Sequence, residues 1–320
     1  MQALVSRSAD TPLEWRDLPD RPLRADEVRV SVEAAGVNPV DWKMRELSLL
    51  GGVQRVLGPR GPFVTGVDFA GRVIDHGPLV TRVRVGDRVV GGTDFSRQQF
   101  GSYARTVQVR EDQVTSLPEG VSVVDAACLP VAGVTAQMCL FDLGRLPRRD
   151  ARDKRVLVLG GAGGVGHFAI QLARNTGAAV FAVCSARNTA LVQRLGATPI
   201  DYGAGDAIDV ARQSGPFDVI VDCIGSKTYP IGRCRALLTP TGRQVLVMPV
   251  PADYVQLAFT PRLLTVLGRA NGENLAPLVA ALANKTLEVV IDQRIPFDEA
   301  ERAHQVSRAG RVVGKLVLVA

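Results

Sequence analysis

The chain has 320 residues, of which 46% are hydrophobic and 22% are charged. This composition is typical of a globular protein, and the length is sufficient for one large domain or two ordinary ones without disulfides or a structural metal. The 38 lysines and arginines are interspersed with 32 acidic residues, so the net charge of +6 does not indicate a nucleic-acid-binding surface.

The cysteines and the apolar segments argue against a disulfide-bonded, zinc-binding, secreted or membrane-spanning protein. No two cysteines have C-x-x-C spacing, and none is combined with histidines as in a zinc site, so we expect free thiols in a reducing compartment. The sequence has no 18-residue apolar run, and its start lacks the apolar stretch of a secretory signal. We therefore expect a cytoplasmic protein that neither spans nor binds a membrane.

Short valine-rich segments separated by Gly, Pro and Asp fill the first 118 residues. They include 27–37, 62–77, 85–92 and 101–109. Strands at this spacing predict a compact β-barrel or sandwich.

A change of character near Ser122 predicts the start of a second domain. Ser122 can cap a helix, and the apolar residues after it have helical spacing. Apolar strand candidates then alternate with helical segments, which is typical of a doubly wound parallel sheet covered by helices on both faces. The expected strands are 155–161, 178–185, 217–225, 243–250 and 262–268.

The last fifty residues return to the pattern of the first part. We expect a helix at 273–284, a strand at 289–295, a short helix at 298–305 and a closing strand near the C-terminus. These segments are expected to pack on the N-terminal part. The α/β domain would then be an insertion between two pieces of one domain.

The most specific motif follows the strand predicted at 155–161. Gly161, Gly163 and Gly166 have G-x-G-x-x-G spacing and precede an amphipathic segment. Gly161 is expected to permit the tight turn, Gly163 to let a pyrophosphate approach the backbone, and Gly166 to let the helix lie close to the strand. The alternative is a tight βα turn without a ligand. The motif predicts a dinucleotide site at the helix N-terminus, which also includes Ala162, Gly164 and Val165.

The end of the next predicted strand, 178–185, distinguishes NADP from NAD. A carboxylate about 20 residues beyond the glycines would bind the ribose 2′-hydroxyl of NAD, and the segment 183–190 contains none. The hydroxyl of Ser185, the guanidinium of Arg187 and the amide of Asn188 instead suit a 2′-phosphate. We therefore predict NADPH as the cofactor. The alternative for Arg187 is a solvent-facing residue at the start of a helix.

Nine segments, taken in chain order, carry a family resemblance. They are AAGVNPVDWKMR (34–45), GVDFAGRV (66–73), VGDRVVG (85–91), GSYAR (101–105), LPVAGVTAQ (129–137), the glycine motif, LGATPIDY (195–202), FDVIVDCIG (217–225) and GRVVGKLVLV (310–319). In this order they resemble the medium-chain dehydrogenase/reductase superfamily, and within it the zinc-independent quinone oxidoreductase and enoyl reductase branch. The resemblance implies a GroES-like β-barrel catalytic domain at 1–124 and 269–320, a Rossmann NADPH-binding domain at 125–268, and an active-site cleft where they meet.

The resemblance also implies roles for individual residues. Asn38 and Thr135 are expected beside the nicotinamide, with Asp41 and Lys43 near the same cleft. The alternative for Lys43 is a surface lysine on a turn after a barrel strand. The further cofactor-binding residues expected from their motif positions are Tyr202, at the 2′-phosphate, Ile224 and Met248.

The positions of the zinc ligands of zinc-dependent relatives hold other residues here. Asn38-Pro39 stands where those relatives have Cys-Gly, and Gly66-Val67-Asp68 where they have Gly-His-Glu. We therefore expect no metal. The segment between Leu47 and Pro62 has no recognisable counterpart, so one wall of the substrate site is not predicted.

The missing zinc ligands favour a conjugated substrate. Hydride addition to an isolated ketone creates a localised alkoxide that zinc would stabilise, whereas addition to a quinone or enone gives a delocalised anion that hydrogen-bond donors can stabilise. We hypothesise an NADPH-dependent quinone or enone reductase in which Asn38, Thr135 or Lys43 stabilises the oxyanion and water supplies the proton. The alternatives are an enoyl-thioester reductase acting on a carrier-bound or coenzyme A substrate, and a non-catalytic NADPH-binding protein.

The predicted strand 262–268 bears on assembly. In relatives the sixth strand of the nucleotide domain pairs with its twin across a two-fold axis, and an apolar edge strand left unpaired invites association. We therefore expect a homodimer.

Overall fold

The computed structural model describes residues 1–6, 11–46, 63–97 and 99–320, so the segment between Leu47 and Pro62 lies outside the described residues. The chain divides into two compact units. The first comprises Met1–Val134, Arg269–Lys285 and Val289–Ala320, and the second Thr135–Gly268 and Thr286–Glu288. The domain limits predicted from the sequence, at 124 and 268, stay a prediction about folding units.

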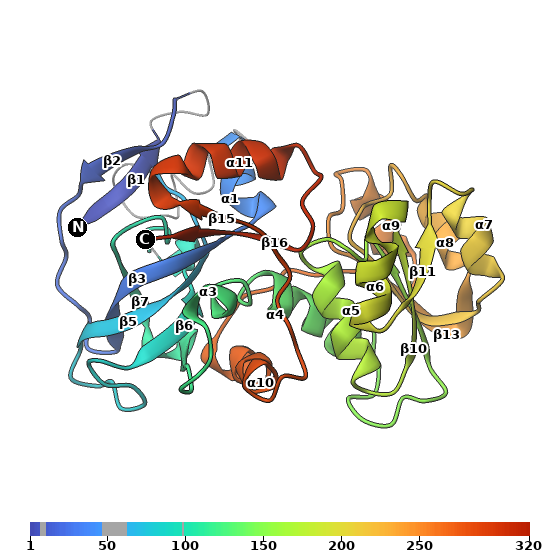
Figure 1. The fold of residues 1–320 in the computed structure, drawn as a ribbon, viewed down its shortest axis with the longest axis horizontal. Helices are drawn as coiled ribbons and strands as arrows, with labels where there is room; N and C mark the ends of the chain where they lie inside the picture. The colour runs from blue at the N-terminus through green and yellow to red at the C-terminus, as the bar shows by residue number, and fades with distance from the viewer. Residues whose placement is uncertain (7–10, 47–62, 98) are drawn as a thin grey trace. The chain divides into compact units, whose positions relative to one another are not determined.

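The first unit is built on a sheet with the strand order β15-β16-β3-β5-β6-β8, in which β7 also pairs with β3 (Figure 1). A smaller sheet has the order β2-β1-β4. The strands are β1 (Gln2–Ser6), β2 (Glu14–Asp17), β3 (Glu27–Val37), β4 (Phe63–Val64), β5 (Asp68–His76), β6 (Arg88–Gly92), β7 (Thr106–Arg110), β8 (Val114–Ser116), β15 (Ile291–Pro296) and β16 (Lys315–Val319).

Strand β3 is the centre of this unit. Its valines Val28, Val30 and Val32 alternate with more exposed residues and belong to the hydrophobic core, as expected of a strand with one buried face. One edge of β3 pairs with β5; the other pairs first with β7 and then with β16. Because β16 ends the chain, the C-terminal segment packs on the N-terminal part as predicted.

The helices around this sheet agree only in part with the sequence pattern. Ser122 caps a helix, as predicted, because its Oγ accepts a hydrogen bond from the backbone N–H of Asp125 at 3.2 Å. That helix ends at Ala126, and the next begins at Ala132, because Pro130 interrupts the helical run. The helices are α1 (Pro39–Glu46), α3 (Val123–Ala126), α4 (Ala132–Gln137), α10 (Gly272–Ala283) and α11 (Ala300–Arg308), with the short 3₁₀ turns η1 (Phe95–Arg97), η2 (Glu111–Gln113) and η5 (Phe297–Glu299).

The second unit contains a six-stranded parallel sheet with the order β11-β10-β9-β12-β13-β14. Counted within the unit, this is the order 3-2-1-4-5-6 of a Rossmann fold, which confirms the predicted fold class. The strands are β9 (Arg155–Leu159), β10 (Ala179–Cys184), β11 (Thr198–Asp201), β12 (Phe217–Asp222), β13 (Leu238–Leu246) and β14 (Leu263–Thr265).

The helices of this unit connect successive strands. Helices α5 and α6 pack on β9, β10 and β11, and α9 packs beside β14 (Figure 1). The elements are the π-helical segment η3 (Met138–Leu143), α5 (Gly166–Arg174), η4 (Ala186–Asn188), α6 (Thr189–Leu195), α7 (Ala207–Arg212), α8 (Ile231–Arg235) and α9 (Asp253–Phe259). In the described part of the chain, no helix has both the length and the apolar character needed to cross a bilayer.

Candidate functional site

The glycine turn between β9 and α5 differs from the prediction in one detail. Gly160, which follows β9 directly, has a φ of +85°, so this residue makes the tight turn. The left-handed residue of the turn is therefore Gly160, and the role predicted for Gly161 is limited to the close packing of the turn. A Cβ at Gly161 would lie 2.7 Å from Cβ of Ala182 on β10, so this glycine allows the turn to pack against the neighbouring strand. The motif specifies spacing, whereas the sign of φ depends on how the strand ends.

The other two glycines lie where their predicted roles require. A Cβ at Gly166 would lie 2.2 Å from the carbonyl oxygen of Gly160, so only glycine lets α5 begin this close to the turn. A Cβ at Gly163 would meet only that same oxygen, at 3.4 Å, so the space above Gly163 is open. An open backbone surface at the N-terminus of α5 fits a pyrophosphate, whose charge the free N–H groups would bind.

The turn lies at the point where the strand order reverses, between β9 and β12. Asp222 ends β12 and is buried, and its Oδ1 accepts hydrogen bonds from the N–H groups of Ile224 at 2.9 Å and Gly225 at 2.7 Å. The side chain of Ile224 lies over Gly160, and the carbonyl of Met248 lies beside Gly225. The structure thus brings the predicted residue Ile224 to the glycine turn, and it places Met248 beside the loop that follows β12. Sequence reasoning missed Asp222, which shapes this loop.

The residues predicted for the 2′-phosphate come from two adjacent strand ends. Cys184 at the end of β10 is the register partner of Asp201 at the end of β11, and the N–H of Tyr202 donates to the carbonyl of Cys184 at 3.1 Å. Ser185 follows Cys184 directly. Arg187 and Tyr202 are exposed, whereas Ser185 and Asn188 are half-buried. The structure therefore places these four residues directly after the ends of two adjacent strands, and the N–H groups of Gly160 and Gly161 in the glycine turn donate to the carbonyl of Val183 in the first of them.

In the first unit, Asn38 joins β3 to α1, and Asp41 lies in the first turn of α1. The backbone N–H of Asn38 donates to Oδ2 of Asp41 at 2.7 Å, and the phenol of Tyr103 donates to the same oxygen at 3.3 Å. Asp41 is fully buried. Burial, together with the charge of Asp68, raises the pKa of Asp41 to about 7. This carboxyl group therefore gains and loses its proton near neutral pH.

Two charged residues that sequence reasoning missed complete a buried network around Asn38. The carboxamide Nδ2 of Asn38 donates to Oδ2 of Asp68 at 2.9 Å, while the ammonium of Lys315 donates to Oδ1 of Asn38. Lys315 lies 3.5 Å from Oδ2 of Asp68. A signal for both was present in the sequence, since Asp68 lies in the GVDFAG segment and Lys315 is the only charged residue of the apolar strand KLVLV. We call Asn38, Asp41, Asp68, Tyr103 and Lys315 the buried network.

The other two predicted catalytic residues are placed differently. Lys43 lies on α1 and is half-buried, with its Nζ 5.5 Å from the ring centroid of Trp42, and burial lowers its pKa. Thr135 belongs to the second unit and is almost fully buried; a Cβ on Gly268 would lie 3.0 Å from its Oγ1. Since Asn38 and Thr135 belong to different units, their common placement beside a nicotinamide stays a prediction.

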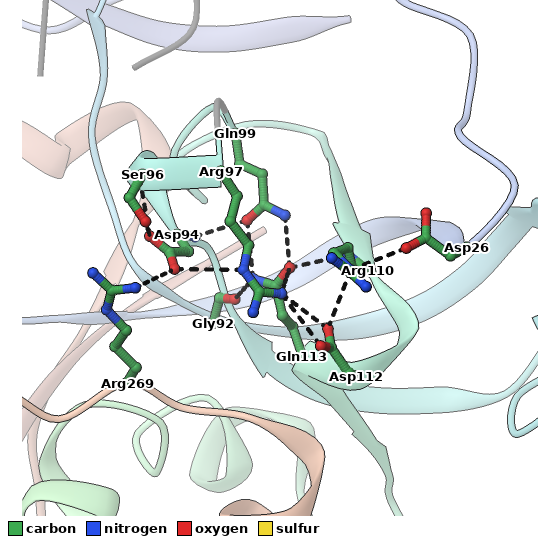
Figure 2. A network of polar contacts seen from close by, with 10 residues as sticks. All are labelled: Asp26, Gly92, Asp94, Ser96, Arg97, Gln99, Arg110, Asp112, Gln113 and Arg269. Atoms are coloured by element: carbon green, nitrogen blue, oxygen red, sulfur yellow. Dashed lines mark hydrogen bonds and ion pairs between the residues drawn. The ribbon is translucent and has the colours of Figure 1, made fainter. Parts of the chain in front are cut away.

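A second polar network follows the end of β6 (Figure 2). The buried side-chain amides of Gln99 and Gln113 donate to each other's oxygens at 2.6 and 2.9 Å, and Nε2 of Gln113 also donates to the carbonyl of Gly92. Around this pair, Asp94 binds Arg269 at 3.3 Å. Partly exposed ion pairs of this kind contribute little stability individually, so the buried amide pair is what holds the segment after β6. We assign this network a structural role.

Comparison with known proteins assigns the chain to a family. Residues 24–119 match the family described as alcohol dehydrogenase GroES-like domain, and 195–318 the family described as zinc-binding dehydrogenase. A trans-enoyl reductase of Aspergillus terreus is 33% identical over 94% of this chain and 89% of its own length. A 2-methylene-furan-3-one reductase of Solanum lycopersicum is 34% identical, over 92% and 72%. The structure of a quinone oxidoreductase from Coxiella burnetii superimposes with a TM-score of 0.85 at 31% identity, covering 100% of this chain and 98% of that one.

The chain belongs to the medium-chain dehydrogenase/reductase superfamily, in its quinone oxidoreductase branch. The predicted resemblance is thus confirmed, and the chain is an oxidoreductase. Membership of this superfamily implies a nicotinamide cofactor, and the open glycine turn at the start of α5 has the shape that its pyrophosphate requires.

The zinc ligands of the zinc-dependent relatives are replaced by other residues in this chain, at Asn38-Pro39 and at Gly66-Val67-Asp68. Asn38 and Asp68 stand at two of those positions, and the structure places the Lys315 ammonium against both. Among the described residues, no three side chains of His, Cys, Asp or Glu are grouped as metal ligands would be.

Proposed function

We propose that the protein is an NADPH-dependent reductase that transfers hydride to a quinone or to the activated double bond of an α,β-unsaturated carbonyl. The observation that carries the choice of cofactor is the position of Ser185, Arg187, Asn188 and Tyr202 directly after the adjacent strands β10 and β11. A guanidinium with hydroxyl and amide donors suits a dianionic 2′-phosphate. The names of the relatives support the acceptor class.

In this proposal each residue has a defined task. A bound nicotinamide would supply the hydride. Thr135 donates its hydroxyl to the oxygen that becomes negative as the acceptor is reduced. Asn38 assists with its second Nδ2 hydrogen, because the first donates to Asp68 and the second has only a contact of 3.5 Å with the carbonyl of Gly36. Lys43, whose pKa is lowered by burial, is a third candidate donor, and water supplies the proton.

The missing zinc ligands explain why a conjugated acceptor is proposed. An enolate or a quinolate carries a delocalised charge, so one or two neutral donors are sufficient to stabilise it. An enoyl thioester has the same electronic character. Reduction of a carrier-bound or coenzyme A thioester is therefore the second candidate, and the trans-enoyl reductase among the relatives favours it.

Steady-state assays with a naphthoquinone, a simple enone and a crotonyl thioester, each with NADPH and with NADH, test the proposal. We expect NADPH to be consumed faster than NADH, with the quinone or the enone as the preferred acceptor. Thr135→Val removes one oxyanion donor and should lower kcat roughly 10²-fold. The control Thr115→Val, on β8, should leave kcat unchanged.

Each of the other possible assay results would change a different part of the proposal. Preference for the thioester supports the second candidate. NADPH binding without turnover of any acceptor would make the protein a non-catalytic nucleotide-binding protein, and a fully active Thr135→Val enzyme would remove Thr135 from the mechanism.

Two further proposals concern the state of the protein. We propose a homodimer formed along β14, the edge strand of the six-stranded sheet. We also propose a cytoplasmic location, because all five cysteines are free thiols, as a reducing compartment maintains them; they are Cys128, Cys139, Cys184, Cys223 and Cys234.

A further inference from the structure

Lys315 is a charged residue at a buried position of the first unit. It begins β16, and only 3% of its surface is exposed. Because Leu316 is the register partner of Val37, the side chain of Lys315 reaches the residues at the end of β3. A buried ammonium group needs acceptors for its three hydrogens, since desolvation of an unpaired charge is costly.

The acceptors of Lys315 are all provided by β3, its extension and β5. Its Nζ donates to the carbonyl of Val37 at 3.1 Å and to Oδ1 of Asn38, and it pairs with the carboxylate of Asp68. The carboxylate is held from its other side, because the N–H of Val131 donates to Oδ1 of Asp68 at 2.9 Å.

These contacts leave the Asn38 carboxamide only one orientation. Its oxygen faces the ammonium of Lys315, and its nitrogen faces the carboxylate of Asp68. A flipped amide would point its N–H groups at the ammonium and its oxygen at the carboxylate, and both contacts would be repulsive. Two opposite charges therefore fix which atom of Asn38 is the donor.

We propose that Lys315 is a positioning residue, which acts with Asp68 to hold the Asn38 carboxamide so that one Nδ2 hydrogen binds Asp68 and the second is available to the developing oxyanion of the substrate. This inference rests on the proposed reductase function. Stability alone does not require the two charges, because a buried ion pair can often be replaced by neutral residues of similar volume without loss of stability. Positioning of Asn38 is therefore a role separate from charge balance.

The decisive experiment separates positioning from charge balance. Lys315→Met leaves the Asp68 carboxylate buried without its cation, so we expect this variant to lose thermal stability or to fold poorly. The double variant Lys315→Met with Asp68→Asn removes both charges while keeping an acceptor for Asn38 Nδ2. We expect its Tm to return close to that of the wild type. Its kcat should stay roughly 10-fold to 100-fold lower, with the KM for NADPH changed by less than about twofold.

The control is Lys154→Met, which removes a partly exposed lysine of the second unit that pairs with Asp153, and it should leave kcat unchanged. If the double variant regains both Tm and kcat, Lys315 only balances a charge and the proposal is wrong. A KM for NADPH that rises together with the fall in kcat would also contradict it, since positioning of a substrate donor does not act on cofactor binding.

A measurement without turnover keeps the inference separate from the proposed function. In ¹⁵N-labelled protein, the side-chain amide resonances of Asn38 are assigned by their loss in Asn38→Ala. We expect one sharp, slowly exchanging pair in the wild type, and broadened, faster-exchanging resonances in the double variant. Unchanged resonances in the double variant would overturn the positioning role whatever the activity, whereas a wild type that reduces none of the acceptors would overturn only the function.

Discussion

Two buried side chains of the first unit have pKa values shifted in opposite directions. Burial and the charge of Asp68 raise the pKa of Asp41 to about 7. Burial lowers the pKa of His304 to about 4, and the charges of Arg45 and Arg308 add to this effect. Both side chains contact Tyr103, which donates to Asp41 and packs on the ring of His304 at a centroid distance of 5.5 Å.

These shifts predict opposite pH dependences of stability. In the unfolded chain Asp41 loses its proton near pH 3.8, whereas in the folded protein it keeps the proton up to about pH 7. The contribution of Asp41 to the free energy of unfolding is therefore complete below pH 3.8 and is lost as the pH rises to 7. In the unfolded chain His304 takes up a proton near pH 6.5, whereas in the folded protein it does so only near pH 4. The contribution of His304 to the free energy of unfolding is therefore lost as the pH falls from 6.5 to 4. These shifts correspond to about 4 kcal/mol for Asp41 and about 3 kcal/mol for His304.

Urea unfolding between about pH 5 and pH 8 tests this prediction. Relative to the wild type, Asp41→Asn should gain stability as the pH rises, and His304→Leu should gain stability as the pH falls. In the wild type the two contributions largely offset each other between pH 4 and 6.5, so neither is visible without its variant. Differences from the wild type that are independent of pH in both variants would show that the two groups do not titrate as described.

At this scale the sequence could predict some members of the buried network but not its charges. Asn38 and Asp41 were predicted because they belong to one short motif. Asp68 and Lys315 lie 30 and 277 residues from Asn38, and only the pairing of β3 with β5 and β16 brings them to it.

The glycine turn between β9 and α5 is the element on which the cofactor proposal depends. Its glycines differ in what a methyl group would meet. At Gly166 the methyl group would collide with the backbone of Gly160, whereas at Gly163 it would make an ordinary contact but occupy the space left for a pyrophosphate.

Alanine variants should therefore separate folding from binding. Gly166→Ala is expected to lower Tm and to abolish NADPH binding, because α5 must move away from the turn. Gly163→Ala should keep its Tm while the Kd for NADPH rises roughly tenfold or more. The control is Gly232→Ala in α8, where no atom of the described residues lies within 4 Å of the added Cβ, so both quantities should be preserved. Calorimetric titration and thermal unfolding provide the two readouts, and unchanged NADPH affinity in Gly163→Ala would place the pyrophosphate elsewhere.

The element boundaries show what periodicity can and cannot predict. Every strand predicted for the parallel sheet is present, because a continuously apolar run is a local signal. Their ends were less accurate. Strand β12 ends at Asp222 and not at 225, since the Asp222 carboxylate binds the following N–H groups and turns the chain. Strand β13 begins at Leu238, before the predicted 243, because Leu238 already pairs with Phe217 of β12, ahead of an irregularity after which the register resumes at Arg243.

At the scale of the whole molecule, the proposed homodimer depends on strand β14, at one edge of the sheet of the second unit. Among the residues that the structure describes, strand β14 pairs with β13 alone, and α9 packs beside it through Leu257. The outer side chains here are unusually exposed for their apolar character, with Phe259 at 84% and Leu267 at 82%. Tyr254 and Val255 on α9 are also exposed, and Val255 and Phe259 are one helical turn apart.

We expect the wild type to have twice the chain mass of 34.2 kDa in light scattering. Phe259→Lys combined with Val255→Lys should shift it to the monomer mass with its circular dichroism preserved, because charges would have to be buried in the interface. Leu79→Lys, at an exposed leucine of the first unit, is the matched control and should remain a dimer. A monomeric wild type, or a double variant that stays dimeric, would contradict the proposed interface.

The sequence by itself determined the two kinds of sheet, the glycine turn and the residues positioned after the ends of β10 and β11. These depend on short-range patterns: the period of apolar residues, the spacing of glycines, and the side chains that follow a strand directly. Only the tertiary structure decided that Gly160 makes the turn, that Asp41 titrates near neutral pH, and that Lys315 and Asp68 orient Asn38. Burial and the meeting of charges from distant strands depend on how β3, β5 and β16 are paired, and no local pattern encodes that pairing.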